Sequence, residues 1–173
     1  MTKKELLVHT ALELFAQKGF NATSTSKIAK QAQVSEGLIF RHFGSKKGLL
    51  KAIIGDIEIK INELFTPIFE LKDPKRVLLE TLKLPFAIEK SSYNYWRLQF
   101  KLKWEDDYDS KSKTDALLSK LTNTFTQLNY KQPELEAQLV VHILDAIASD
   151  LLKGNLEKTT NYQQFLIQKY GLI

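Results

Sequence analysis

The sequence lacks cysteine altogether and contains few glycine and proline residues, seven and four in 173. Without cysteine, disulfide scaffolds, cysteine-ligated zinc sites and thiol catalysis are excluded. No run of about 18 apolar residues occurs, so no helix is expected to span a membrane. The N-terminus is charged and passes directly into an amphipathic pattern, unlike a signal peptide. We therefore expect a soluble, cytoplasmic protein.

Hydrophobic residues make up 43% of the chain, which is enough to bury a core and argues against wholesale disorder. The length predicts one domain, or one small module on a larger one. The basic charge is concentrated at one end, because residues 1–50 hold eight Lys or Arg, three Asp or Glu and hence the entire net charge of +5. The remaining 17 basic residues are balanced by 17 acidic ones. This asymmetry indicates an N-terminal segment that binds polyanions.

Hydrophobic residues recur with a period close to 3.6 along nearly the whole chain, without strict alternation and without an internal repeat. The pattern predicts an all-α protein of about nine helices and no sheet. The hydrophobic stripes that predict helices cover residues 7–15, 24–32, 50–65, 93–104, 114–128, 134–153 and 162–170. A polar connection is expected over residues 104–113.

Capping residues and prolines predict where several helices begin and end. Gly19 should end the first helix, and Ser45 should cap the long helix that follows the N-terminal segment. Pro67 should end or kink that long helix, because proline lacks the N–H group that a helix interior needs. Asp73 is expected to cap a helix that has proline at its first position. Pro85 should kink or divide that helix.

Two short helices lie within the basic segment, over residues 24–32 and 36–42. A tight turn at Gln33 and Val34 joins them, and Ser35 is expected to cap the second. Two short helices joined by a tight turn and flanked by longer helices form a helix-turn-helix motif. The second helix would enter the major groove of DNA. The residues expected to face outward there are Ser35, Glu36, Gly37, Leu38, Arg41 and His42.

A family resemblance rests on the run Ala11-Leu-Glu-Leu-Phe-Ala-Gln-Lys-Gly-Phe20 and on several short groups of residues that follow it in the sequence. These are Thr23-Ser, Ile28-Ala29, Val34-Ser35, Gly37, Arg41-His42-Phe43 and Ser45-Lys46. Together they resemble the N-terminal domain of the TetR family of bacterial repressors, over residues 3 to about 55. The resemblance implies a homodimer that binds a palindromic operator in double-stranded DNA. It also implies C-terminal helices that dimerise and bind a small-molecule effector.

The resemblance divides the chain into a DNA-binding domain over residues 1–47 and an effector-binding and dimerisation domain over residues 48–173. It implies that Thr25 and Lys46 contact phosphate. The full set of DNA contacts that it implies is Thr25, Ser35, Glu36, Gly37, Leu38, Phe40, Arg41, His42 and Lys46. The residues by themselves leave two roles open. Glu36 either accepts from a cytosine amine or only complements the helix dipole, and His42 contacts phosphate or packs.

Three residues depart from the family pattern. Phe40 stands where the family usually has tyrosine, so a phosphate-contacting hydroxyl is missing. Leu38 replaces a small polar residue and favours apolar contact, for example with a thymine methyl group. Gln33 replaces the glycine of the turn, which predicts backbone strain there.

An aromatic stripe at helical spacing characterises the middle of the chain and has two interpretations. It either packs in the core or lines an effector pocket, since helical bundles place ligand sites between helices. The residues of the candidate pocket are Phe86, Tyr93, Trp96, Phe100, Trp104 and Phe125.

The helix over residues 134–153 has an apolar surface wider than one core face needs. With the last helix it is expected to form a four-helix dimer interface, two helices from each subunit. The interface candidates are Leu139, Ile143, Ile147, Leu151, Phe165 and Leu166. We expect a transcriptional regulator, a repressor rather than an enzyme, without cofactor, metal or catalytic site. A regulator without an effector and a helical enzyme or small-molecule carrier are the alternatives.

Overall fold

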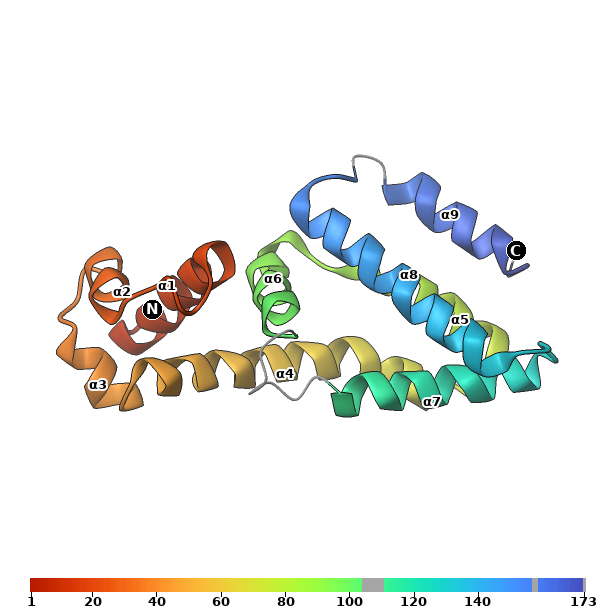
Figure 1. Cartoon of the computed structure of the whole chain (residues 1–173), viewed down its shortest axis with the longest axis horizontal. Coiled ribbons are helices and arrows are strands. Elements are labelled where there is room, and N and C mark those ends of the chain that lie inside the picture. The colour runs from red at the N-terminus through yellow and green to blue at the C-terminus, as the bar shows by residue number, and fades with distance from the viewer. Residues whose placement is uncertain (104–110, 157–158, 173) are drawn as a thin grey trace. The chain divides into compact units, whose positions relative to one another are not determined.

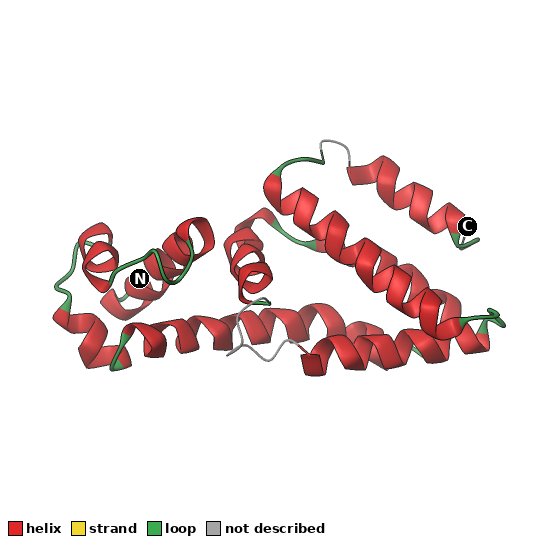
Figure 2. Cartoon of the chain, viewed as in Figure 1, coloured by secondary structure: helices red, strands yellow, loops and turns green. Residues whose placement is uncertain are grey.

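The computed structural model describes residues 1–103, 111–156 and 159–172, and this part of the chain is helical without a strand (Figures 1 and 2). The all-α prediction is confirmed. The α-helices are α1 Lys3–Lys18, α2 Thr25–Gln31, α3 Gly37–Phe43, α4 Lys46–Glu70, α5 Pro74–Lys83, α6 Tyr93–Leu102, α7 Lys111–Gln127, α8 Pro133–Lys153 and α9 Thr159–Lys169. Two short 3-10 helices, η1 Leu84–Ala87 and η2 Lys90–Ser92, lie between α5 and α6.

The chain forms two compact units. The N-terminal unit holds Met1–Asn62 together with α6, and the C-terminal unit holds Glu63–Lys90 together with α7, α8 and α9. The long helix α4 contributes residues to both. The sequence predicted a DNA-binding domain over residues 1–47 and a second domain over residues 48–173. That boundary describes the extent of the DNA-binding module rather than of a compact unit, and it stays a prediction.

Helix ends follow the local signals in the sequence. The N–H group of Gly19 donates to the carbonyl of Phe15 and ends α1, with the glycine at a positive φ of 86°. The side chain of Ser45 accepts a hydrogen bond from the N–H group of Gly48 at 3.0 Å, as expected of a helix cap. The carboxylate of Asp73 likewise accepts from a backbone N–H group in the first turn of α5, at 2.7 Å. These boundaries confirm the predictions.

Pro67 was predicted to end or kink the long helix. It does not end α4, which continues to Glu70, so the first of these two predictions is wrong. The reason is that the last turn of α4 is held by tertiary contacts. The ammonium group of Lys120 in α7 donates to the carbonyls of Phe69 at 3.1 Å and Leu71 at 2.7 Å. A cation at a helix C-terminus stabilises the helix through its dipole and its free carbonyl groups.

Pro85 acts as predicted, because α5 ends at Lys83 and the proline lies in η1. The helix expected from Thr114 begins already at Lys111, so the last three residues of the expected polar connection are helical. The rest of that connection lies outside the described residues.

The core of the N-terminal unit forms around α1, which packs against α2, α3 and α6. Each of these helices presents one apolar face to it. The fully buried side chains of this core include Leu7, Phe15, Ile28, Ile39, Leu49, Ile53, Ile57 and Leu98. The short helices α2 and α3, of seven residues each, are thus stabilised by burial, since isolated helices of this length are not stable in water.

The core of the C-terminal unit is formed by α5, α7, α8 and α9. Its buried residues are Leu78, Leu82, Leu117, Leu121, Phe125, Ala137, Val140, Val141, Leu144, Ile147, Leu166 and Tyr170. A smaller cluster of Ile68, Val77 and Leu84 joins the end of α4 to α5 and η1. Ile68 and Leu84 of this smaller cluster also line a cavity of the same unit.

Candidate nucleic-acid interface

The turn between α2 and α3 brings the two helices close together. Ala29 of α2 and Ile39 of α3 are both buried. The N–H group of Val34 donates back to the carbonyl of Ala29 at 3.0 Å and closes the turn. Gln33 has a φ of 54°, in the left-handed region that favours glycine. The strain expected at Gln33 is therefore present, and the helix-turn-helix geometry forms in spite of it.

The start of α3 differs from the prediction. Ser35 is not the cap, because α3 begins at Gly37, its cap is Glu36, and no side chain satisfies the cap position. The backbone of Glu36 is already helical, with φ −58° and ψ −33°. The first turn is closed by backbone groups instead, since the carbonyl of Ser35 accepts from the N–H group of Leu38 at 3.1 Å.

A hydrogen bond joins the starts of the two helices. The hydroxyl group of Thr25 donates to the carboxylate of Glu36 at 2.6 Å, and both side chains are partly buried. This bond gives Glu36 a structural role that the sequence did not indicate. It also orients Thr25, whose hydroxyl is a predicted phosphate contact, at the N-terminal end of α2.

The outer face of α3 is exposed. Phe40 is 51% exposed, and Gly37, Arg41 and His42 are exposed as well, whereas Ile39 between them is fully buried. A β-carbon added at Gly37 would meet no atom within 4 Å. The glycine is therefore not required by internal packing, and its bare backbone leaves the outer surface free for close approach.

Lys46, a predicted phosphate contact, has two partners inside the N-terminal unit. Its ammonium group donates to the carbonyls of Phe20 and Thr23, each at 3.0 Å, and lies 4.2 Å from the centre of the Phe20 ring. An ammonium group has three N–H donors, so one remains for a phosphate. Lys46 thereby fixes the start of α4 to the loop between α1 and α2, and its contact with DNA stays a prediction.

Gly48 is required for the junction of α3 and α4, although the sequence pattern did not predict this role. A β-carbon there would overlap the carbonyl oxygen of Phe43, the last residue of α3. Only glycine allows α4 to begin so close to the end of α3. In the sequence, Gly48 is marked only by its position three residues after the capping serine. The atom that makes glycine necessary is the carbonyl oxygen of Phe43 in the preceding helix, which no local pattern indicates.

Positive charge is concentrated beside α2. The neighbouring ammonium group of Lys18 lowers the pKa of Lys27, through hydrogen bonding and charge repulsion. Both side chains are exposed. Two cations held this close create a local field that attracts anions such as phosphate.

The residues of the candidate effector pocket do not lie in one compact unit. Phe86 and Phe125 belong to the C-terminal unit, whereas Tyr93, Trp96 and Phe100 lie on α6 in the N-terminal unit. Trp104, the sixth candidate, lies outside the described residues. Phe125 is completely buried in the core of its unit, where its ring centre lies 4.9 Å from that of Tyr130. The effector role of these residues stays a prediction.

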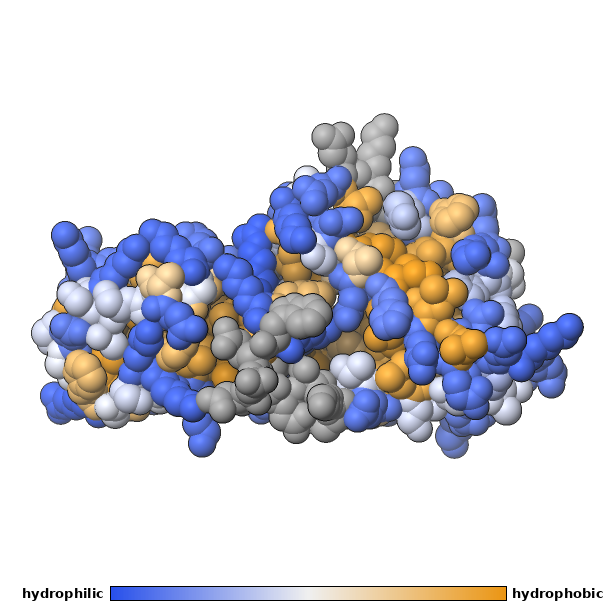
Figure 3. Space-filling model, viewed as in Figure 1, coloured by the Kyte–Doolittle hydropathy of each residue, from blue (hydrophilic) through white to orange (hydrophobic). Residues whose placement is uncertain are grey.

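The candidate dimer residues fall into three degrees of exposure. Leu139 on α8 and Phe165 on α9 are 47% and 60% exposed. Ile147 and Leu166 are buried in the core of the C-terminal unit, and Ile143 and Leu151 are partly buried against it. Leu135 and Tyr162, on the same two helices, are also largely exposed. Figure 3 shows hydrophobic residues on the surface over α8 and α9.

Within the described ranges, no helix is long and apolar enough to cross a membrane. The same part of the chain contains no group of three or more His, Asp or Glu side chains that could hold a metal ion.

Known proteins share the helix-turn-helix segment. Residues 7–53 match the model of the family described as bacterial regulatory proteins, tetR family. The chain is 40% identical over 70 residues to the uncharacterized HTH-type transcriptional regulator YuxN of Bacillus subtilis, covering 40% of this chain and 23% of that protein. It is 40% identical over 58 residues to the HTH-type transcriptional repressor Rv3405c of Mycobacterium tuberculosis, covering 34% and 31%. The match thus spans about a quarter to a third of the length of these curated relatives.

Solved structures resemble the whole chain in fold. A TetR-like transcriptional regulator from Rhodococcus sp. RHA1 superimposes with a TM-score of 0.81 and 20% identity, over 95% of this chain and 91% of that one. The relatives named for a role are transcriptional regulators rather than enzymes. Residues 7–53 of this chain are thus similar to the helix-turn-helix segment of the bacterial regulatory proteins of the tetR family.

Proposed function

We propose that the chain is a homodimeric transcriptional repressor that binds a palindromic operator and is released from it by a small-molecule effector. Such a regulator acts on chromosomal DNA and hence in the cytoplasm. The observation that carries the proposal is the geometry of α3. Its inner residue Ile39 is buried and anchors the helix, while its outer face is exposed and basic.

The exposed face of α3 supports binding in the major groove. A recognition helix reads base edges with the residues near its N-terminus and contacts the backbone with its remaining outer residues. Gly37 and Leu38 occupy the first turn of α3, and Arg41 follows one turn later. A guanidinium group can donate two hydrogen bonds to guanine. Phe40 has no hydroxyl, so its exposed ring supports only apolar contact with the DNA backbone.

Selection of bound sequences from random double-stranded DNA tests this function. We expect an enriched palindrome with half-sites one helical turn apart, about 34–36 Å. Recovery of DNA without an enriched palindrome would contradict the proposal, and so would binding that shows no preference over competitor DNA.

Arg41→Ala should then weaken binding to the selected operator by about 1–3 kcal/mol and relax the preference at one base pair of each half-site. The physical reason is the loss of a bidentate contact with a base edge. Electrophoretic mobility shifts over a series of single-base operator variants measure both effects. Lys72→Ala, which removes an exposed cation from the C-terminal unit, is the matched control and should leave operator binding unchanged.

The exposed apolar residues of α8 and α9 support dimerisation. Leu135 and Leu139 are separated by one helical turn on α8, as Tyr162 and Phe165 are on α9, and these last two rings lie 6.4 Å apart. Monomeric soluble proteins rarely expose several large apolar side chains side by side. An interface between two copies would bury them, as in a four-helix arrangement with two helices from each subunit.

An effector is supported by the ligands of structural neighbours. AibR was solved with isovaleryl coenzyme A and operator DNA, at a TM-score of 0.66 and 14% identity. A putative regulator from Saccharomonospora viridis was solved with choline, at a TM-score of 0.70 and 17% identity. In this chain α4 begins directly behind the recognition helix and continues into the C-terminal unit. A ligand that binds there with different affinity in two states of α4 would shift the DNA affinity.

A further inference from the structure

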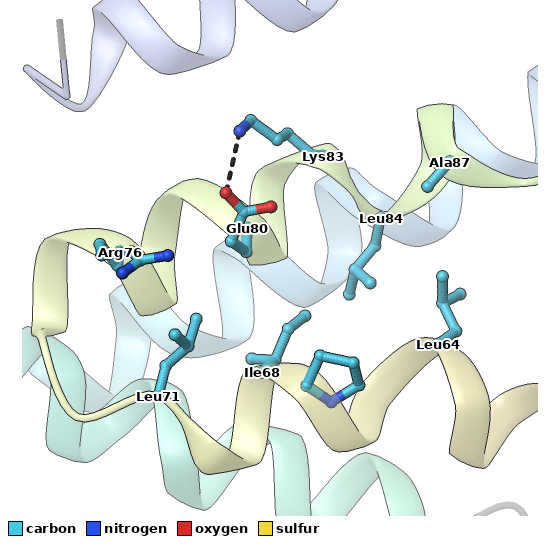
Figure 4. Close-up of a pocket in the computed structure, with 9 residues that line it drawn as sticks. Leu64, Ile68, Leu71, Arg76, Glu80, Lys83, Leu84 and Ala87 are labelled. Atoms are coloured by element: carbon cyan, nitrogen blue, oxygen red, sulfur yellow. Dashed lines mark hydrogen bonds and ion pairs between the residues drawn. The ribbon is translucent and has the colours of Figure 1, made fainter.

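A cavity of about 320 Å³ lies in the C-terminal unit, between the end of α4 and the segment formed by α5 and η1. Figure 4 shows Leu64, Ile68 and Leu71 rising from α4, with Leu84 of η1 pointing toward them. Pro67 and Ala87 complete the apolar wall. The volume falls at the lower end of the range typical of small-molecule sites, about 300–1,000 Å³.

The polar groups of the cavity come from one face of α5. They are Arg76, Glu80 and Lys83, two cations and one anion. The ammonium group of Lys83 forms an ion pair with the carboxylate of Glu80 at 2.9 Å. Arg76 is exposed, and among the described residues its guanidinium group has no hydrogen-bond or ion-pair partner. The cavity therefore combines an apolar wall with a single unpaired positive charge.

From this combination we infer that the cavity binds an amphipathic monocarboxylate, with its hydrocarbon chain against α4 and its carboxylate on Arg76. A guanidinium group and a carboxylate form two parallel charge-assisted hydrogen bonds, which favours this anion over a neutral or cationic head group. The role of this site as the effector site rests on the proposed function, whereas binding itself does not.

The cavity volume limits the size of the ligand. A water-sized group occupies about 30 Å³ of liquid, so the cavity holds about ten such groups. A carboxylate with a chain of about six to ten carbons fills this space. Each methylene group that enters the cavity should tighten binding about fourfold, the equivalent of about 0.8 kcal/mol. The gain should cease once the chain is longer than the cavity.

Isothermal titration calorimetry of the full chain tests the inference with straight-chain carboxylates of four to twelve carbons. We expect affinity to rise about fourfold for each added methylene and then to level off. Octanoate should bind about tenfold more tightly than octanol, because hydrogen bonds to a charged carboxylate are stronger than those to a neutral hydroxyl group, and more tightly than octylammonium. Affinity that does not depend on chain length, or equal affinity for octanoate and octanol, would overturn the inference.

Two variants locate the site. Arg76→Gln should abolish the preference for octanoate over octanol, whereas Lys75→Gln, which removes the adjacent exposed cation outside the cavity, should preserve it. Ala87→Leu should fill part of the cavity and shift the levelling point to a shorter chain. Circular dichroism and the melting temperature confirm that each variant is folded. An equal loss of preference in the two charge variants would place the carboxylate elsewhere and contradict the site.

Operator binding in the presence of octanoate separates this inference from the proposed function. Octanoate that binds the cavity and weakens operator binding in the wild type, but not in Arg76→Gln, supports both. Octanoate that binds without any effect on operator affinity supports the cavity and contradicts its role as the effector site. Operator binding without octanoate binding contradicts the cavity and leaves the DNA-binding function intact.

Discussion

At the scale of single residues, side chains near the recognition helix have partners inside the protein. Lys46 was expected at a phosphate, yet its ammonium group donates to two carbonyls of the α1–α2 loop. Glu36 was considered for base contact, yet its carboxylate accepts from the Thr25 hydroxyl. These bonds hold the short helices in place, so the residues influence DNA binding through geometry as well as through contact.

Lys46→Met should lower the free energy of unfolding by about 1–2 kcal/mol, because two charge-assisted hydrogen bonds are lost while the apolar stem is kept. Urea denaturation measures this loss, and Lys51→Met, at an exposed position of α4, is the control. If the third N–H donor also binds phosphate, the slope of log affinity against log salt falls by about one unit. Unchanged stability would rule out the structural role of Lys46.

Tyr170 carries a buried hydroxyl group without a hydrogen-bond partner in the described structure. Tyr170→Phe removes this group and should raise the free energy of unfolding at neutral pH by about 1 kcal/mol, because an unsatisfied buried polar group costs stability. Thermal and urea unfolding measure the change. Tyr130→Phe, a partly exposed neighbour of the same cluster, should leave the stability almost unchanged.

The pH dependence of Tyr170 gives a second measurement. Burial and the nearby carboxylate of Glu136 raise the pKa of Tyr170 to about 12, above its ordinary value of 10. The neutral phenol is therefore favoured in the folded state. Between pH 10 and 12 the phenol of the unfolded chain ionises while that of the folded protein stays neutral, so the free energy of unfolding is unaffected below pH 10 and falls as the pH rises from 10 to 12. Tyr170→Phe should show a smaller loss over that range, and equal losses in both proteins would contradict the assignment.

At the scale of helices, local signals accounted for most boundaries and tertiary contacts for the rest. Caps and prolines marked the end of α1 and both ends of α5 correctly because they act on the nearest backbone groups. The prediction that Pro67 could end α4 was wrong because Lys120, more than fifty residues later, binds the carbonyls at the end of that helix. The predicted cap of α3 was wrong by one residue, since α3 begins at Gly37 and no side chain caps it.

Gly48→Ala should destabilise the junction of α3 and α4 by about 1–3 kcal/mol, because the added methyl group overlaps the backbone carbonyl of Phe43. The recognition helix would have to shift, so operator affinity should fall together with stability. Unfolding and mobility-shift experiments measure the two losses. Gly55→Ala on the same helix, where a β-carbon meets no atom, is the control and should be neutral or slightly stabilising.

At the scale of the whole molecule, the two compact units bear different kinds of surface. The N-terminal unit contains the α3 face and the segment with the whole net charge of +5, whereas the C-terminal unit exposes apolar residues on α8 and α9. This distribution matches a protein that binds a polyanion with one part and a second copy of itself with another. The cavity beside α5 lies within the second unit.

If the proposed dimer forms through α8 and α9, Phe165→Glu should convert it into a monomer, because a charge in an apolar interface is buried without a partner. Analytical ultracentrifugation measures the mass of the wild type and the variant. The residue is 60% exposed in the single chain, so the fold itself should be kept. Gln164→Glu, at an exposed neighbouring position, is the charge-matched control. A wild-type protein that sediments as a monomer at high concentration would contradict the dimer.

The sequence by itself determined the helical class, most helix ends, the helix-turn-helix motif and the concentration of charge. These features depend on contacts between residues a few positions apart, and on a motif that is read residue by residue. Tertiary structure alone decided which members of the aromatic stripe share a compact unit, which candidate dimer residues are exposed and where Arg76 has a cavity beside it. It also decided the partners of Lys46 and the need for glycine at position 48. The physical reason is that these features depend on burial, hydrogen bonding and steric overlap between residues of different helices. A local sequence pattern does not encode how close such residues lie in space.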